Sequence, residues 1–215
     1  MTKRNAILCV FAILTVFSYA REYGDSAIYQ GINIKLDLGN TVYELARSKA
    51  KIQSYEVAVN VMLKRRFLPT LELGFATAQT SAAGGKHIGT GGFGRVGLDI
   101  STLKKAGTES LLLVGVRLGT AVQGYELQDV RIWDTYWQTN TLKSYPTSVK
   151  ADVWGEVVAG LQVKIYKGFH MGWFFRFKAM FTRQTNDKPV PYYIPGYGYR
   201  QDTNFGFNYY IGYKF

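Results

Sequence analysis

Charged residues stand at alternate positions inside stretches that are otherwise apolar or small. They are Lys35, Asp37, Glu56, Glu72, Arg95, Asp99, Arg117, Glu156, Lys164, Arg176, Lys178 and Lys214. Two carboxylates held close together, such as Glu56 and Glu72, would suit acid–base catalysis. Acids and bases that face one another would instead form a structural network, because unpaired charge is expensive to bury. We favour the network, since the barrel inferred below is only wide enough for its own side chains.

The mature chain has two histidines, His87 and His170. Barrel enzymes that modify lipid A use His, Ser and acidic residues near the outer leaflet, and His87 with Ser81 and Asp134 would supply such a set. No spacing in the sequence requires that arrangement. We therefore predict no catalytic residue and keep lipid A acyl transfer or deacylation as the alternative. No cluster has metal-ligand spacing, and we predict no metal and no cofactor.

A glycine-rich segment, Gly89-Thr90-Gly91-Gly92-Phe93-Gly94, has the spacing of a dinucleotide-binding loop. That loop needs a strand before it and a helix after it, so that the phosphates meet a helix N-terminus. Here the alternation predicts a strand after it. We therefore interpret residues 80–92 as a loose external loop.

The last thirteen residues alternate most clearly. Large apolar side chains occupy every second position from Phe205 to Phe215, and small or polar ones occupy the positions between. Because side chains of a strand point alternately to its two faces, this segment has one aromatic and one polar face. A transmembrane barrel strand has this pattern, since one face meets lipid and the other a polar lumen. Phe215 also matches the C-terminal aromatic signature that the barrel assembly machinery reads.

The same alternation predicts eight strands. Their expected bounds are Ala27–Gly39, Ser54–Leu63, Thr70–Gln79, Phe93–Ser101, Ser110–Gly124, Lys150–Tyr166, Phe169–Thr182 and Thr203–Phe215. The connections alternate between long and short, as in outer-membrane barrels with short periplasmic turns and longer external loops. A soluble eight-stranded barrel of the lipocalin kind is the competing fold, but it would place the apolar residues inside.

The N-terminus resembles an export signal. Lys3 and Arg4 precede an apolar run from Ala6 to Phe17, and Ser18-Tyr19-Ala20 offers a cleavage site. We therefore predict a signal peptide over residues 1–20 and a barrel over residues 21–215, similar in size to OmpA or OmpX. Later residues contain no run long enough for a membrane helix.

The net charge and the cysteine content limit which partners and which chemistry are plausible. The only cysteine, Cys9, lies in the predicted signal peptide, so the mature chain has no disulfide or thiol chemistry. The formal charge of +11, of which Lys3 and Arg4 carry two units, suits lipopolysaccharide phosphates. We expect no nucleic-acid partner for an exported chain.

Aromatic residues gather in the predicted external loops. Trp133, Trp137, Tyr192, Tyr193 and Tyr197 are our predicted contact residues for a partner, since Trp and Tyr dominate interface hot spots. An aromatic belt at the membrane surface is the alternative. The proline-rich segment 189–199 is predicted to be either a rigid cap over the barrel mouth or a docking surface.

The segment Tyr192-Tyr193-Ile194-Pro195-Gly196-Tyr197 and the strand Phe205-Gly206-Phe207-Asn208-Tyr209 together resemble a known family, domain of unknown function 6048 (DUF6048). The resemblance implies a small exported outer-membrane barrel, but it implies no activity and carries over no functional residue.

We therefore expect an eight-stranded outer-membrane β-barrel with a non-enzymatic structural or interaction role, such as a small subunit of an envelope assembly. Its expected partners are outer-membrane lipid, lipopolysaccharide, the barrel assembly machinery and an outer-membrane protein.

Overall fold

The computed structural model describes residues 28–37, 50–64, 66–82, 85–102, 110–134, 136, 139–182 and 191–215. The predicted signal peptide lies outside these ranges. Within them the chain is all strand and turn, so it holds no helix long and apolar enough to cross a membrane.

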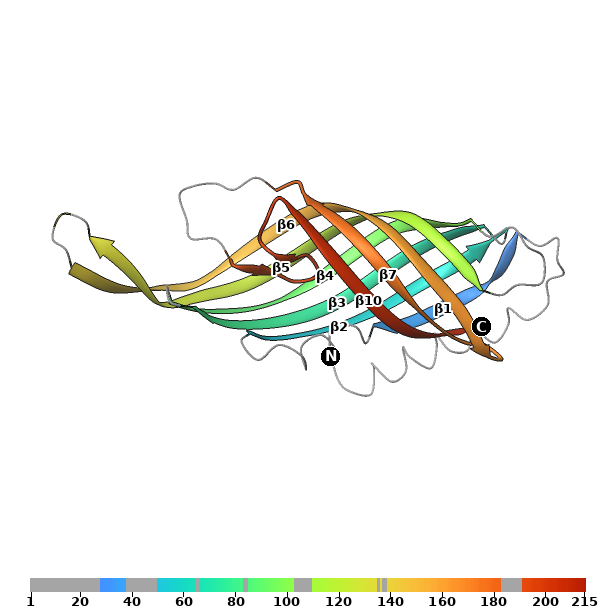
Figure 1. Cartoon of the computed structure of the whole chain (residues 1–215), viewed down its shortest axis with the longest axis horizontal. Helices are drawn as coiled ribbons and strands as arrows, with labels where there is room; N and C mark the ends of the chain where they lie inside the picture. The colour runs from blue at the N-terminus through green and yellow to red at the C-terminus, as the bar shows by residue number, and fades with distance from the viewer. Residues whose placement is uncertain are drawn as a thin grey trace, which may run out of the picture.

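Eight antiparallel strands close into a barrel whose strands are strongly tilted (Figure 1). Around the ring they lie in the order β1, β10, β7, β6, β5, β4, β3, β2. Their bounds are β1 Tyr29–Asp37, β2 Ala50–Leu63, β3 Phe67–Ala82, β4 Gly85–Ser101, β5 Leu111–Asp134, β6 Thr139–Tyr166, β7 Phe169–Met180 and β10 Thr203–Lys214. The prediction of eight barrel strands in antiparallel order is confirmed.

Consecutive strands from β1 to β7 pair antiparallel, β7 pairs with β10, and the ring closes where β1 meets β10. That seam pairs Asn33 with Lys214 and runs to the pair Asp37–Tyr210. Lys167, with φ 50°, and Gly168 make the tight turn between β6 and β7 that the sequence predicted.

Two predicted loops are wrong. Residues 80–92 are not a loose loop, because β4 begins at Gly85 and pairs with β3 and β5 throughout. Residues 125–149 are not an irregular connection either, because β5 and β6 continue pairing as far as Asp134 and Thr139. Neither segment has one face against an apolar environment, which is the condition that produces strict alternation. The sequence pattern therefore does not reveal that they are strands.

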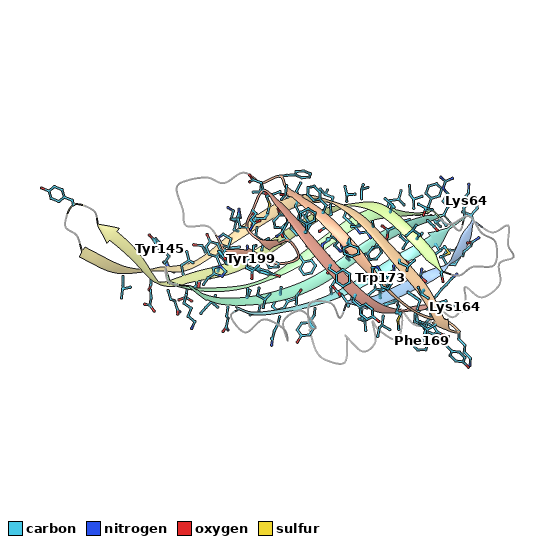
Figure 2. The ribbon with its side chains drawn as sticks, in the orientation of Figure 1. Lys64, Tyr145, Lys164, Phe169, Trp173 and Tyr199 are labelled. Atoms are coloured by element: carbon cyan, nitrogen blue, oxygen red, sulfur yellow. The ribbon has the colours of Figure 1, made fainter. Side chains whose placement is uncertain are left out.

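The extension of β5 and β6 forms a two-stranded ribbon that projects beyond the barrel, at the left in Figure 1. We call residues 129–134 and 139–152 the arm, since β5 pairs with β4 only as far as Gln128, and β6 pairs with β7 only from Trp154 onwards. Register shifts after Tyr125 and Leu127, with Asp129 at φ 54°, mark its base. Tyr145 lies on the arm, whereas Lys64, Lys164 and Phe169 lie at the opposite end (Figure 2).

A second small sheet lies at the arm end of the barrel. Strands β8 (Tyr193–Ile194) and β9 (Gly198–Tyr199) form a short hairpin within the connection from β7 to β10. We call residues 191–202 the cap.

Side chains divide between the two faces of the barrel as the alternation predicts. On β5, Val116 is 59% exposed while its neighbour Arg117 is 4% exposed. The outer face carries large exposed apolar side chains, including the labelled Trp173 (Figure 2), and the inner face carries most of the charged ones. This distribution is the reverse of a soluble barrel with an apolar interior.

Small residues make room for large ones inside the narrow barrel. Trp154 on β6 is fully buried and lies over Gly119 of the neighbouring β5, where an added Cβ would come within 2.6 Å of the indole Cζ2. The indole cannot move aside easily, because its Nε1 donates a hydrogen bond to Glu156 at 2.6 Å.

The variant Gly119→Ala is therefore expected to lower the free energy of unfolding by about 1–3 kcal/mol, the usual range for overpacking. Urea unfolding in detergent micelles, followed by tryptophan fluorescence, would measure it. Gly124→Ala is the matched control, because its added Cβ would meet only Thr147 Cγ2 at 3.7 Å. Equal effects of the two variants would contradict this account of the packing.

Candidate functional site

The centre of the lumen is organised around one carboxylate, Glu72 of β3. Its Oε2 accepts from Arg95 at 2.9 Å and from Arg176 at 2.8 Å, and its Oε1 accepts from Arg117 Nε at 3.0 Å. Arg117 also forms a two-pronged pair with Asp99, at 2.6 and 2.9 Å. These guanidinium groups come from β4, β7 and β5, so the charges join strands from opposite sides of the ring.

Two further carboxylates are shared by the same cations. Glu56 of β2 lies 2.8 Å from Arg95 Nη1 and 3.5 Å from Arg176 Nη2. Glu156 of β6 lies 2.9 Å from Arg95 Nε and 3.0 Å from Arg176 Nη1. All of these side chains are almost completely buried. Each charge is therefore compensated by more than one partner, which burial in a low-dielectric interior requires.

The ion-pair cluster also holds the cap in place. Arg95 Nη2 donates to the Gly196 carbonyl at 2.7 Å, and Lys178 Nζ donates to the same oxygen at 2.6 Å and to the Tyr197 carbonyl at 3.1 Å. The cap turns so sharply there because Gly196 has φ +73°, which L side chains rarely adopt. The carbonyl oxygens at the tip of the cap thus point at cations of the barrel wall.

Apolar contacts seal the cap against the wall. Ile194 and Tyr197 pack with Phe93, Ala121 and Trp154, and all five side chains are buried. The rings of Trp154 and Tyr197 meet edge to face with centroids 5.6 Å apart. The cap is therefore an inserted plug at the arm end of the lumen.

Polar contacts complete the attachment of the cap. Arg200 pairs with the buried Asp152 of β6 at 2.6 Å and donates to the Pro191 carbonyl at 3.2 Å. The Tyr197 hydroxyl donates to the Gln201 carbonyl at 2.7 Å. Burial, reinforced by the charge of Asp202, raises the pKa of Tyr197 above its usual value, so the hydroxyl stays protonated and keeps donating.

The other end of the lumen is closed by apolar packing. The buried side chains there come from β2, β3, β5, β6, β7 and β10, and they are Met62, Leu68, Leu111, Leu113, Val158, Phe174 and Tyr210. The described lumen therefore has an apolar floor, a charged middle and a capped mouth.

Four of the predicted network residues lie apart from the central ion pairs. Lys35 is buried against the Tyr210 and Phe174 rings, while the half-buried Asp37 accepts a hydrogen bond from Asn208. Lys164 is exposed at the end of β6. The half-buried Lys214 lies near the Met62 sulfur, at 3.8 Å. The expectation of one lumen-wide network is thus too broad for Lys164 in particular, because β6 reaches the barrel rim there.

The predicted contact residues divide in a way that the sequence did not anticipate. Tyr193 and Tyr197 are 9% and 1% exposed, so a partner cannot reach them while the cap is inserted, and their prediction as exposed contact residues needs correction. Tyr192 is 54% exposed and stays available. Trp133 belongs to β5 within the arm, and Trp137 lies outside the described residues.

The structure separates Asp134 from the other two residues of the alternative enzyme site. His87 pairs with Leu127 of β5, whereas Asp134 lies seven positions further along that strand, about 23 Å away at the usual strand rise. Ser81 lies one register position from His87, because Ser81 pairs with Lys86 and the preceding Thr80 pairs with His87. Among the described residues, no group of three or more His, Cys, Asp or Glu side chains is arranged to hold a metal ion.

Sequence reasoning missed the partners of the cap. Arg95 and Lys178 were expected to neutralise acids, but both also bind backbone oxygens of the cap, and the pairing of Asp152 with Arg200 was not predicted. Hydrogen bonds to backbone carbonyl oxygens cannot be predicted from residue types, because every residue carries such an oxygen. The three prolines and two glycines of residues 189–198 were the one available signal that this segment has a defined shape.

A comparison of the sequence with family models finds a match over almost the whole chain. The family model named Domain of unknown function (DUF6048) matches residues 4–215. The chain belongs to this family. The match covers the whole barrel and confirms the resemblance seen in the segments around Tyr193 and Tyr209. A comparison with curated proteins finds no match.

Removing the central carboxylate charge is expected to loosen the whole barrel. Glu72→Gln leaves three buried guanidinium groups short of an anion, and the free energy of unfolding should fall by about 3–5 kcal/mol. Urea unfolding in micelles checks it. Glu126→Gln is the matched control, because Glu126 is only half-buried near the arm base and bonds Gln128. An unchanged midpoint for Glu72→Gln would refute the central role of this carboxylate.

Proposed function

We propose that this chain is an outer-membrane β-barrel with a non-enzymatic role, in which the barrel anchors an arm that contacts another envelope protein. The observation that carries the proposal is the combination of a sealed lumen with a two-stranded arm projecting from one end. The outer face supports the membrane part, and the arm supports the interaction part.

The outer face offers a continuous apolar surface. Each barrel strand contributes large side chains that are at least a third exposed, among them Leu36, Tyr55, Leu73, Val96, Val116, Val157, Phe175 and Phe207. On β5 these run from Leu112 to Val122, which is close to the 9–11 residues that a tilted strand needs to cross a bilayer. In water this surface would be a large exposed apolar patch, whereas in lipid it is solvated.

Orientation follows from the ends of the barrel. The turns at Lys64 and Lys167 and the terminal Phe215 share one end, and the arm and cap share the other (Figure 1). Outer-membrane barrels keep short turns in the periplasm. The proposal therefore places the arm and cap outside the cell, near lipopolysaccharide, and presents β10 with Phe215 to the barrel assembly machinery.

The closed lumen argues against transport. A solute would have to pass the apolar floor, the Glu72 cluster and the inserted cap, and each is packed with buried side chains. Eight strands leave an interior that side chains can fill.

The arm is the part of the molecule that barrel closure does not explain. A two-stranded ribbon is at best marginally stable alone in water, because it has no second layer to bury a face. Several large side chains along it and at its tip are exposed, with Tyr136 at 83%, Leu142 at 63% and Val149 at 75%, whereas Asp152 at its base is buried. Exposed aromatic and aliphatic groups on a projecting ribbon are suited to bury against a protein partner.

The lipid A enzyme remains the competing hypothesis, but no observation favours it. Its residues His87 and Asp134 are separated along the barrel and arm, and His87 is buried in the wall with 4% exposure. A barrel that only presents a surface needs neither a nucleophile nor a base.

A lysine in the middle of the apolar outer face should prevent insertion. Val116→Lys is expected to cost about 2–4 kcal/mol in the bilayer, which would deplete the folded protein from outer-membrane fractions. Leu142→Lys is the control, because Leu142 is equally exposed but lies on the arm. If both variants reach the membrane at wild-type levels, or the wild type fractionates as a soluble protein, the membrane proposal fails.

Crosslinking from the arm tests the partner. A photo-crosslinking amino acid at Tyr136 is expected to capture one discrete envelope protein in intact cells. The same probe at Thr102, exposed at the opposite end, is expected to give no such adduct. If Tyr136 yields no protein adduct, and deleting the gene changes the lipid A masses, the enzymatic alternative replaces the interaction role.

A further inference from the structure

The lumen contains a small cavity of about 20 Å³ beside the seam that closes the barrel. Its wall includes Lys35 of β1, Phe174 and Arg176 of β7, and Asn208 and Tyr210 of β10. β1 and β10 meet at the seam, and β7 is the next strand round the ring. A group bound in the cavity would therefore touch both sides of the closure.

Lys35 is a buried cation without a carboxylate partner. The side chain is 3% exposed, and its Nζ lies 4.6 Å from the centre of the Tyr210 ring and 5.2 Å from that of the Phe174 ring. No described carboxylate lies within ion-pair distance of it. Ring faces attract the charge but do not accept three directed N–H bonds as oxygen or a halide does.

Arg176 supplies a second unpartnered donor to the same cavity. Its two terminal nitrogens bind Glu72, Glu156 and Glu56, but the buried Nε has no hydrogen-bond partner. The guanidinium carbon lies 5.8 Å from the Phe174 ring centre, on the ring that Lys35 also approaches. Two positively charged groups with free N–H donors thus line one small space.

The buried positive charges outnumber the buried negative charges near the centre of the lumen. Among the residues that the structure describes, and apart from Asp152, which pairs with Arg200 of the cap, the almost completely buried charged groups are the cations Lys35, Arg95, Arg117, Arg176 and Lys178 and the carboxylates Glu56, Glu72, Asp99 and Glu156. Asp37 also lines the cavity, but it is only half-buried and accepts from Asn208. One cation is left over in a medium where an uncompensated charge is costly.

We propose that this cavity binds a small monovalent anion, of which chloride is the simplest, between Lys35 and Arg176. The anion compensates the surplus cation and accepts the free N–H donors. Because Glu56 and Glu72 also line the cavity, a dianion or a bulky carboxylate would be repelled. The bound anion bridges β1 to β7 across β10 and so stabilises the closed barrel. The inference concerns the purified chain and does not rest on the proposed membrane or partner role.

The test compares the full chain refolded in detergent with chloride or with gluconate, at equal ionic strength. Chloride is expected to raise the melting temperature by roughly 3–5 °C for each tenfold increase once the site is filled, whereas gluconate is too large to enter. Lys35→Met should abolish this chloride dependence, whatever its effect on the melting temperature itself. Lys164→Met is the matched control and should retain it, since Lys164 is exposed at the rim.

Crystals of the wild type grown in bromide give a direct readout that does not depend on a variant folding. An anomalous peak beside Lys35 Nζ and Arg176 Nε is expected. Equal melting in chloride and gluconate, or a cavity that holds only water, would overturn the proposal. A bromide peak without any chloride effect on melting would mark an adventitious ion only and would overturn it as well.

Discussion

Glu72 and the three guanidinium groups around it are the interaction on which the rest of the interior depends. Removing these charges from water is costly, and the cost is offset only while Arg95, Arg117 and Arg176 all stay in place. Since those residues stand on three different strands, the cluster constrains the register and closure of the whole ring. A barrel that closed with a shifted register would leave buried charge without a partner.

The same cluster explains why the mouth is capped by a backbone turn rather than by side chains alone. Arg95 and Lys178 have N–H donors that face the arm end of the lumen and that the carboxylates of the cluster do not use. The Gly196 carbonyl meets both of them, and apolar packing of Ile194 and Tyr197 covers the contact. Hydrogen bonds from the buried cations and apolar packing against the barrel wall thus fix one position for the cap.

The interior and the exterior of the barrel follow from one rule, the alternation of side chains along a strand. Alternation places charged side chains inward and apolar ones outward along the barrel strands. Paired charges therefore stabilise the interior, and apolar side chains form the outer surface. The arm escapes this rule because both of its faces lie beyond the barrel wall. Its residues carry mixed patterns, and its edges are the ones that we propose meet a protein partner.

The sequence by itself determined the strands of the ring and the face of each side chain, because a period of two is local and is written directly in residue order. That period alone is enough to assign charged residues such as Glu72, Arg117 and Arg176 to the inward face. The ends of the strands were harder to predict from the sequence, because residues 80–92 and 125–149 lie where the environment no longer enforces alternation. Only the tertiary structure decided which cation meets which acid, that Tyr193 and Tyr197 are buried in a plug, and that His87 and Asp134 are far apart. Those outcomes depend on strand register and on backbone carbonyls brought together across the ring, and neither is encoded in the identity or spacing of neighbouring residues.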